Sequence, residues 1–390
     1  MNIERIRKDT PGTQNVIHLN NAGASLMPRV VSESIIRYLH EESSYGGYET
    51  AHKNRESIEQ TYTAIAKFIN AHPNEIALLE NATAAWNMAF FSIDFRTGDR
   101  ILISKSEYAS NYLSYLRLKK QIDIKIEVIP NDEQGQTSVS ALKKMMDNNV
   151  KLVSITHIPT NSGLVNPVEK IGNITQNYDC YYLVDACQSV GQYPVDVKKI
   201  GCDMLSATGR KYLRGPRGTG FLYVSSDKIE NLLPPFIDLH AAEWTSENDY
   251  EIRSDARRFE NWEMNYAGII GLKKAVEYAS DIGIRQIWKR ITKLAENLRW
   301  ELAELPGVTL HDIGKIKGGI VSFTVDSVSA KEVKKSLSEK GINVSTSSKS
   351  STLLDMKDRN LSTLIRASVH YYNTETEIDQ IIDALKTLNQ

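Results

Sequence analysis

The stretch that decides the fold is YYLVDACQSVGQYPVDV (181–197), followed by ATGRKYLRGPRGTGFLYV (207–224). An apolar run typical of a buried strand ends at Asp185. A Gly-rich basic loop carrying Lys211 then leads into a second apolar run. Ligands of open α/β sheets bind beyond the carboxyl ends of the strands. One crossover helix and one strand fit between the two residues, so we expect both to reach one crevice.

Working outward from this stretch, short β-rich runs alternate with longer helical patterns. The expected strands are IALLE (76–80), RILIS (100–104), KIEVI (125–129), KLVSIT (151–156), YYLVD (181–185) and GTGFLYV (218–224), with helices such as 139–148 and 166–175 between them. This alternation predicts an α/β fold whose mostly parallel central sheet carries helices on both faces.

The sequence pattern changes at about residue 265. The expected elements beyond it are a long helical region (265–304), a strand in GGIVSFTV (318–325), a helix (330–340), a Ser/Thr-rich loop, a strand in IRASV (365–369) and a last helix (375–388). We therefore predict a large domain over 18–264 and a smaller α+β domain over 265–390. The N-terminal segment 1–17 is expected to pack near the small domain.

The composition is that of an ordinary globular protein. Of 390 residues, 41% are hydrophobic and 24% charged, and the net charge is −1, which disfavours a nucleic-acid or membrane partner. The first residues do not resemble a signal peptide. The three cysteines, Cys180, Cys187 and Cys202, show no metal-ligand spacing, so no metal site is expected. Reduced thiols predict a cytoplasmic protein.

Asp185 and Lys211 together suggest a cofactor. Pyridoxal 5′-phosphate (PLP) needs a lysine for its aldehyde and an acid for its pyridine nitrogen. Arg210, Arg214 and Arg217 are cations that can lower the pKa of Lys211. Taken singly, Asp185 also fits a helix N-cap, and the basic loop also fits a solvated turn.

Three further stretches carry weaker signals. In LLENATAAWN (78–87) a helix starts after a strand, and its backbone N–H groups with Thr83 suit a phosphate, although an ordinary cap looks the same. Tyr108 in SEYASN (106–111) can stack on a flat ring or simply pack. Arg366 can hold a carboxylate or form a surface ion pair.

The order and spacing of these motifs resemble the class V aminotransferase-like, fold-type I PLP enzymes. That group includes cysteine desulfurases, isopenicillin N epimerase and the C–S lyases of ergothioneine biosynthesis. The resemblance runs from HLNNAG (18–23) to the last helix. It is most specific in VDACQSVGQYPVDV (184–197), RKYLRGPRGTGFLYV (210–224) and RASVHYYNTETEID (366–379).

The resemblance implies a role for each candidate. Lys211 is the Schiff-base lysine, Asp185 pairs with the pyridine nitrogen, and Gln188 bonds the phenolic oxygen of PLP. The other implied cofactor-binding residues are Ala82, Thr83, Thr208 and Arg210 at the phosphate, Tyr108 on the ring and Thr160 near the cofactor oxygen. The implied substrate-binding residues are Arg366, for the α-carboxylate, with Ala22 and Gly23. The family also implies a homodimer with active sites at the subunit interface.

Two departures from the desulfurase pattern shape the expected reaction. The stretch GINVSTSSKSSTLLDM (341–356) lacks the cysteine that desulfurases carry on a mobile loop to accept sulfur. Glu263, in RRFENWEMNYAG (257–268), stands about where they place a threonine that reaches the neighbouring phosphate, so Trp262 or Asn265 is expected to line the site instead.

These departures lead us to expect a PLP-dependent C–S β-lyase, similar to hercynylcysteine sulfoxide lyases. It would release pyruvate and ammonia from an S-substituted cysteine or its sulfoxide. An isopenicillin N epimerase-like isomerase is an alternative, with Tyr108 or His157 as its second acid/base. An aminotransferase is another. A cysteine desulfurase is disfavoured by the missing loop cysteine, and a non-enzymatic PLP-binding regulator by the lack of an effector module.

Overall fold

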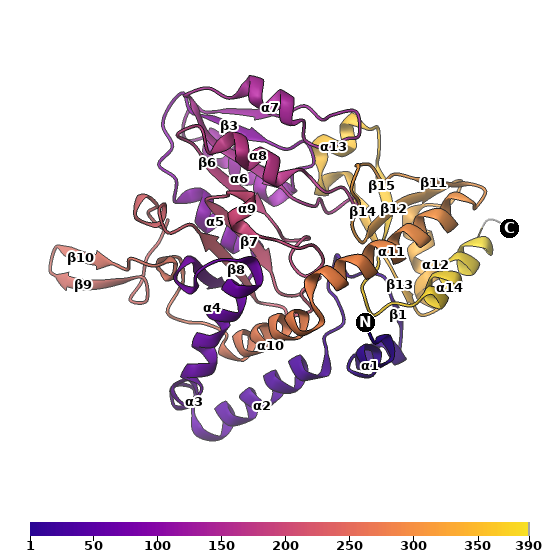
Figure 1. The fold of residues 1–390 in the computed structure, drawn as a ribbon, viewed down its shortest axis with the longest axis horizontal. Coiled ribbons are helices and arrows are strands. Elements are labelled where there is room, and N and C mark those ends of the chain that lie inside the picture. The colour runs from indigo at the N-terminus through magenta and orange to yellow at the C-terminus, as the bar shows by residue number, and fades with distance from the viewer. Residues whose placement is uncertain (389–390) are drawn as a thin grey trace.

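A seven-stranded sheet forms the centre of the computed structural model, which describes residues 1–388 (Figure 1). Its strands are β2 (Ile76–Leu79), β3 (Arg100–Ile103), β4 (Lys125–Val128), β5 (Val150–Thr156), β6 (Tyr181–Asp185), β7 (Met204–Thr208) and β8 (Gly220–Val224). Their order is β2-β8-β7-β6-β5-β3-β4, and β8 runs antiparallel to both neighbours. The predicted α/β fold with a mostly parallel sheet is confirmed.

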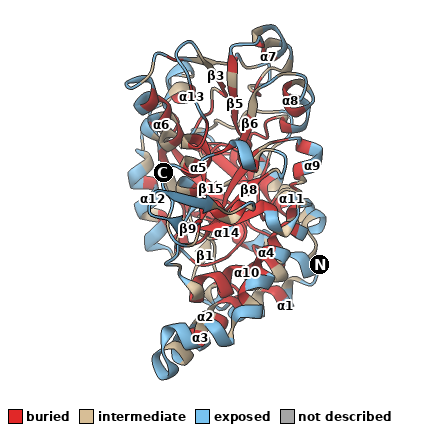
Figure 2. Cartoon of the chain, turned by 90° about the vertical axis from the view of Figure 1, so that its left-hand side faces the viewer, coloured by how far each residue is buried: buried red, intermediate tan, exposed pale blue. Residues whose placement is uncertain are grey.

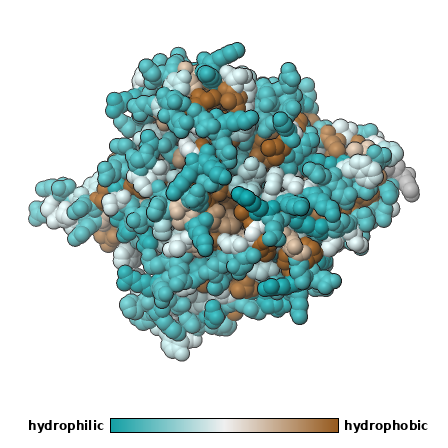
Figure 3. Space-filling model, in the orientation of Figure 1, coloured by the Kyte–Doolittle hydropathy of each residue, from teal (hydrophilic) through white to brown (hydrophobic). Residues whose placement is uncertain are grey.

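Helices cover both faces of this sheet because both faces are apolar. Neighbouring residues of a strand point to opposite faces. Leu183 of β6 accordingly joins one hydrophobic cluster, with Trp86 and Tyr115, while Val184 joins the other, with Ile171. The covering helices include α5 (Ala82–Phe91), α6 (Ala109–Lys119), α7 (Val139–Met145), α8 (Val168–Thr175) and α9 (Val197–Ile200). Figure 2 shows the buried residues concentrated at the sheet, and Figure 3 shows a largely hydrophilic outer face.

A second, antiparallel sheet lies in the C-terminal part of the chain. Its order is β11 (Val308–Leu310), β12 (Ile320–Val325), β15 (Thr363–Ser368), β14 (Ser345–Ser348). The accompanying helices are α11 (Ile284–Ala303), α12 (Ala330–Glu339), α13 (Leu353–Asp358) and α14 (Glu375–Lys386). The Ser/Thr-rich stretch was expected to be a loop, and this is wrong at 345–348. Those residues pair with β15, and Ser347 is buried.

The long helical region also differs from expectation. It consists of two helices, α10 (Tyr266–Ile282) and α11, which meet at Gly283 with a φ of 89°. That backbone conformation favours glycine and ends the first helix. Helix α10 packs against α2 (Arg29–Tyr45) and α4 (Arg55–Ile69), and α3 (Gly47–Lys53) lies between those two in the chain. The domain boundary at 264/265 stays a prediction.

The N-terminal residues connect the two sheets. Strand β1 (Ile17–His18) pairs with β13 (Ile342–Asn343), and Arg7 of α1 (Ile3–Lys8) forms an ion pair with Glu377 of α14 at 2.7 Å. The N-terminal segment thus lies against β13 and α14 of the C-terminal part, where Figure 1 shows α1 and β1. Within residues 1–388, no helix has the length and apolar character needed to cross a membrane.

Arg214 holds this N-terminal segment against the loop that follows Lys211. Its guanidinium donates to the Leu26 carbonyl (2.8 Å), the Thr10 hydroxyl (2.6 Å) and the Tyr371 hydroxyl (2.8 Å). Only 1% of Arg214 is exposed. The Arg214 guanidinium was one of the cations expected to act on Lys211, but it instead forms its hydrogen bonds with the N-terminal residues and Tyr371. Arg217, by contrast, is exposed.

Replacing Arg214 by methionine should destabilise the protein strongly. Arg214→Met leaves three oxygen atoms without their donors, two buried and one partly buried, at about 1 kcal/mol or more each, so the free energy of unfolding should fall by roughly 3 kcal/mol. Urea unfolding followed by circular dichroism measures this change. Arg217→Met is the matched control and should leave the midpoint unchanged. Equal midpoints for the two variants would contradict the account of Arg214.

Candidate active site

All nine residues expected to bind the cofactor line one pocket at the edge of the central sheet. The lining consists of Asn81, Ala82, Thr83, Tyr108, Thr156, Ile158, Thr160, Asp185, Cys187, Gln188, Thr208, Arg210 and Lys211. They come from the ends of β5, β6 and β7, from the start of α5 and from the residue before α6. Parallel strands bring their carboxyl ends to one edge, which explains why residues so far apart in sequence meet.

Asp185, the last residue of β6, is held in a fixed orientation. One carboxylate oxygen accepts a hydrogen bond from the Asn111 side-chain amide (3.0 Å), and the other accepts from the backbone N–H of Cys187 (2.9 Å). Only 7% of Asp185 is exposed. Asn111 was not among the residues expected from the sequence. It follows Glu107 by four residues near the start of a helix, and this spacing places two side chains together.

Lys211 is half-buried and lines the same pocket as Cys187, whose thiol is within reach of its charge. Burial raises the pKa of Cys187, and the neighbouring lysine opposes that rise only in part. A thiol with a raised pKa stays protonated near neutral pH and is a poor nucleophile. This agrees with a packing role for Cys187.

The start of helix α5 forms one end of the pocket. The Asn81 side chain caps the helix by accepting from the Ala84 N–H at 2.9 Å. Ala82 and Thr83, in its first turn, lie where an anion is favoured by the helix dipole. Arg210 lines the same pocket and donates to the Gly23 carbonyl. One of its N–H groups therefore ties the segment around Ala22-Gly23 to the pocket.

A buried cation lies next to the pocket, against the lining residue Thr160. Arg366 of β15 donates to the carbonyl (2.9 Å) and hydroxyl (2.7 Å) of Thr160, and its Nε has no partner. Burial lowers the pKa of Arg366 to about 10, so it remains charged at neutral pH. In the described part of the chain no acidic side chain balances it. A buried charge without a counter-ion is costly, which favours a carboxylate ligand here.

These residues fit PLP. Gln188 donates to the Ala22 carbonyl (3.1 Å), while its own side-chain oxygen is buried without a partner, as expected of a group that meets a ligand. The pocket joins an amine, a fixed carboxylate and a helix start, and a buried arginine bonds to Thr160 in its wall. Lys211 would hold the aldehyde, Asp185 the ring nitrogen, and the start of α5 with Thr208 the phosphate.

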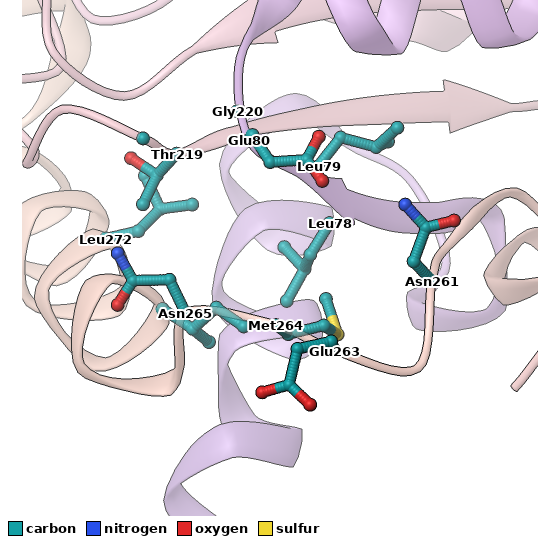
Figure 4. A pocket seen from close by; sticks show the side chains of 12 residues that line it. Leu78, Leu79, Glu80, Thr219, Gly220, Asn261, Glu263, Met264, Asn265 and Leu272 are labelled. Atoms are coloured by element: carbon teal, nitrogen blue, oxygen red, sulfur yellow. The ribbon is translucent and has the colours of Figure 1, made fainter.

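Glu263 and Asn265 lie elsewhere, around a small cavity with Leu78 and Thr219 (Figure 4). The Asn265 side chain accepts from the Gly268 N–H at 2.8 Å and so caps α10. Trp262 is largely exposed. In the described chain these side chains do not line the pocket of Lys211 of their own subunit. The expectation that Trp262 or Asn265 lines an active site at a subunit interface stays a prediction.

Comparison with known proteins identifies the family. The model of the class-V aminotransferase family matches residues 17–381. The chain belongs to this family. Its cofactor is PLP, and it is a PLP-dependent enzyme of fold-type I. A solved structure similar to this chain, C-DES with glycine linked to its PLP cofactor, has a TM-score of 0.88 at 24% identity and covers 97% of this chain and 98% of its own.

Full-length relatives at about 30% identity are named cysteine desulfurases. A probable cysteine desulfurase of Methanothermobacter thermautotrophicus is 31% identical, covering 100% of this chain and 98% of the relative. The apo structure of a cysteine desulfurase from Thermococcus onnurineus has a TM-score of 0.93 at 29% identity, covering 99% of this chain and 97% of its own.

These matches overturn the expected reaction. The β-lyase on S-substituted cysteines or their sulfoxides, with its link to ergothioneine, is wrong as the main interpretation, because the missing loop cysteine was given more weight than similarity along the whole chain. The isomerase and aminotransferase alternatives fit no better. His157, one proposed second base, packs against Tyr193 and does not line the Lys211 pocket in the described chain. Burial lowers its pKa to about 3.

Arg366→Ala should weaken the binding of amino acids that carry a carboxylate. A hydrogen bond to a charged group contributes about 1.5–3 kcal/mol, so the affinity of the holoenzyme for L-alanine should fall about 10- to 150-fold. Cofactor absorbance during titration reports the binding. Ethylamine, which lacks the carboxylate, serves as the matched ligand and should lose less than about twofold. Equal losses for both ligands would assign Arg366 a purely structural role.

Proposed function

We propose that this enzyme is a cysteine desulfurase, which removes the sulfur of L-cysteine and leaves L-alanine. The observation that carries the proposal is similarity over the full chain to relatives that bear this name, at about 30% identity. The pocket supports it, because an amine, a fixed carboxylate and a buried arginine are the groups that a PLP enzyme needs to bind a small amino acid.

Three side chains have separate roles in the proposed reaction. Arg366 binds the α-carboxylate of cysteine and thereby directs its Cα toward Lys211. Asp185 pairs with the ring nitrogen. When bound, PLP takes up the amino group of the substrate and accepts the electrons released at Cα. Lys211, once freed from the cofactor, is the base that removes the Cα proton and returns it.

The sulfur acceptor is a thiol that enters from solution. Residues 341–356 contain no cysteine, and the thiol of Cys187 has a pKa raised by burial. The overall step is cysteine plus a thiol giving alanine plus a persulfide. One C–S bond breaks, one S–S bond forms, and the step needs no external oxidant or reductant. A small-molecule thiol can supply the nucleophile that the chain does not offer.

We also propose that the enzyme is a homodimer with its active sites at the interface. The hairpin of β9 (Ala242–Ser246) and β10 (Asp249–Ile252) projects from the molecule (Figure 1) and exposes Trp244 and Tyr250. Large exposed aromatic side chains on a projecting element are typical of a protein contact.

A cytoplasmic location is supported by the three free cysteines.

Product analysis tests the reaction directly. Holoenzyme incubated with L-cysteine and dithiothreitol should produce alanine and sulfide in equal amounts. The rate should rise with the dithiothreitol concentration, because the acceptor is external. Alanine and pyruvate are separated by chromatography, and sulfide is assayed by colour formation.

Two results would contradict this account. Pyruvate and ammonia in place of alanine would mean elimination and would refute desulfuration. Alanine formed together with a stoichiometric persulfide on Cys187, detected by mass spectrometry, would leave desulfuration standing and refute the external acceptor. Lys211→Ala is the control that should give neither product.

A further inference from the structure

A second carboxyl group is buried behind Asp185. Glu107 is 3% exposed and lies just before α6. One of its oxygen atoms accepts from the Thr156 hydroxyl (2.7 Å), the Tyr108 N–H (2.8 Å) and the Asn111 amide (2.9 Å), and the other accepts from the Tyr115 hydroxyl (3.0 Å). All four donors are neutral. In the described part of the chain no cation neutralises Glu107.

Asn111 connects this carboxyl group to Asp185. Its side-chain nitrogen donates to Glu107 at 2.9 Å and to Asp185 at 3.0 Å, which uses both of its N–H groups. The amide oxygen of Asn111 cannot point toward either carboxylate without breaking both bonds. Glu107 therefore fixes the direction in which Asn111 donates, and Asn111 fixes Asp185.

Two carboxylates bridged by one amide repel each other in a buried site. Burial raises the pKa of Glu107 to about 7, and the nearby Asp185 adds to that rise. Such a pair is stabilised when a cation arrives next to it. The position facing Asp185 is open to the pocket, and the ring nitrogen of PLP is a group that can carry a proton there.

We propose that Glu107 is a positioning residue that acts through Asn111: it orients Asp185 and adds a second negative charge that keeps the PLP ring nitrogen protonated. The inference rests on the pairing of Asp185 with that nitrogen, proposed above. It explains why a carboxyl group without a counter-ion is kept beneath the site. A purely structural carboxyl group would hold α6 to β5 whatever occupies the pocket.

Binding of two cofactors distinguishes these roles. Apoenzyme is titrated with PLP and with an analogue in which a C–H group replaces the ring nitrogen and cannot be protonated. Glu107→Gln should weaken PLP binding roughly tenfold, the scale of one charge-assisted hydrogen bond, and change analogue binding less than about twofold. Glu107→Asp, which keeps the charge, should restore part of the affinity for PLP. Equal losses for both ligands, or no loss for PLP, would overturn the inference.

Three further variants keep the test decisive. Glu80→Gln removes an exposed carboxyl group near the pocket and should change neither affinity. Asp185→Asn should weaken PLP binding more than analogue binding. If Asp185→Asn has this effect and Glu107→Gln does not, only the inference about Glu107 fails. If neither variant has it, the pairing of Asp185 with the ring nitrogen fails as well. Should Glu107→Gln not fold, Asn111→Leu removes the amide through which Glu107 is proposed to act, and equal losses for the two ligands in that variant would overturn the inference.

Discussion

The buried carboxylate at the end of β6 is the constraint on which the rest of the site depends. Asp185 is removed from water, and its oxygen atoms are fixed by the Asn111 side chain and the Cys187 N–H. A buried charge requires a partner, and neutral donors satisfy it only in part. The central sheet supplies the rigid base, and Lys211 reaches the same edge from the loop after β7. In the proposed pairing, the protonated ring nitrogen of PLP would provide the missing cation.

In the proposed function, the side of the pocket that binds the substrate depends on residues distant in sequence. Arg366 belongs to the second sheet but bonds to Thr160 in the loop after β5. Ala22, near the N-terminus, accepts from Gln188 through its carbonyl and donates through its N–H to the Ser368 hydroxyl oxygen. Arg214 ties the N-terminal segment to the loop of Lys211. Substrate binding is therefore coupled to the way in which the C-terminal part and the first residues pack on the central sheet.

The sequence predicted the central sheet and the cofactor pocket because both depend on local patterns. Apolar runs ending in Asp185, and a helix starting at Ala82, are visible without a structure. The strand at 345–348 was not predictable, because serine and threonine gain their strand conformation there from pairing with β15. Asn111 was missed because its importance lies in a contact with Asp185, 74 residues away, and Glu107 was missed because it reaches Asp185 only through Asn111. The reaction was misjudged because one absent cysteine outweighed the similarity of the whole chain.

The most direct test of the central claim is to locate the covalent bond between cofactor and protein. Holoenzyme is reduced with borohydride, digested, and analysed by mass spectrometry for the lysine that carries the pyridoxyl group. The account predicts a single modified peptide with the label on Lys211, and no label in Lys211→Ala. A label on any other lysine, or a label retained by Lys211→Ala, would contradict the assignment of this pocket as the PLP site.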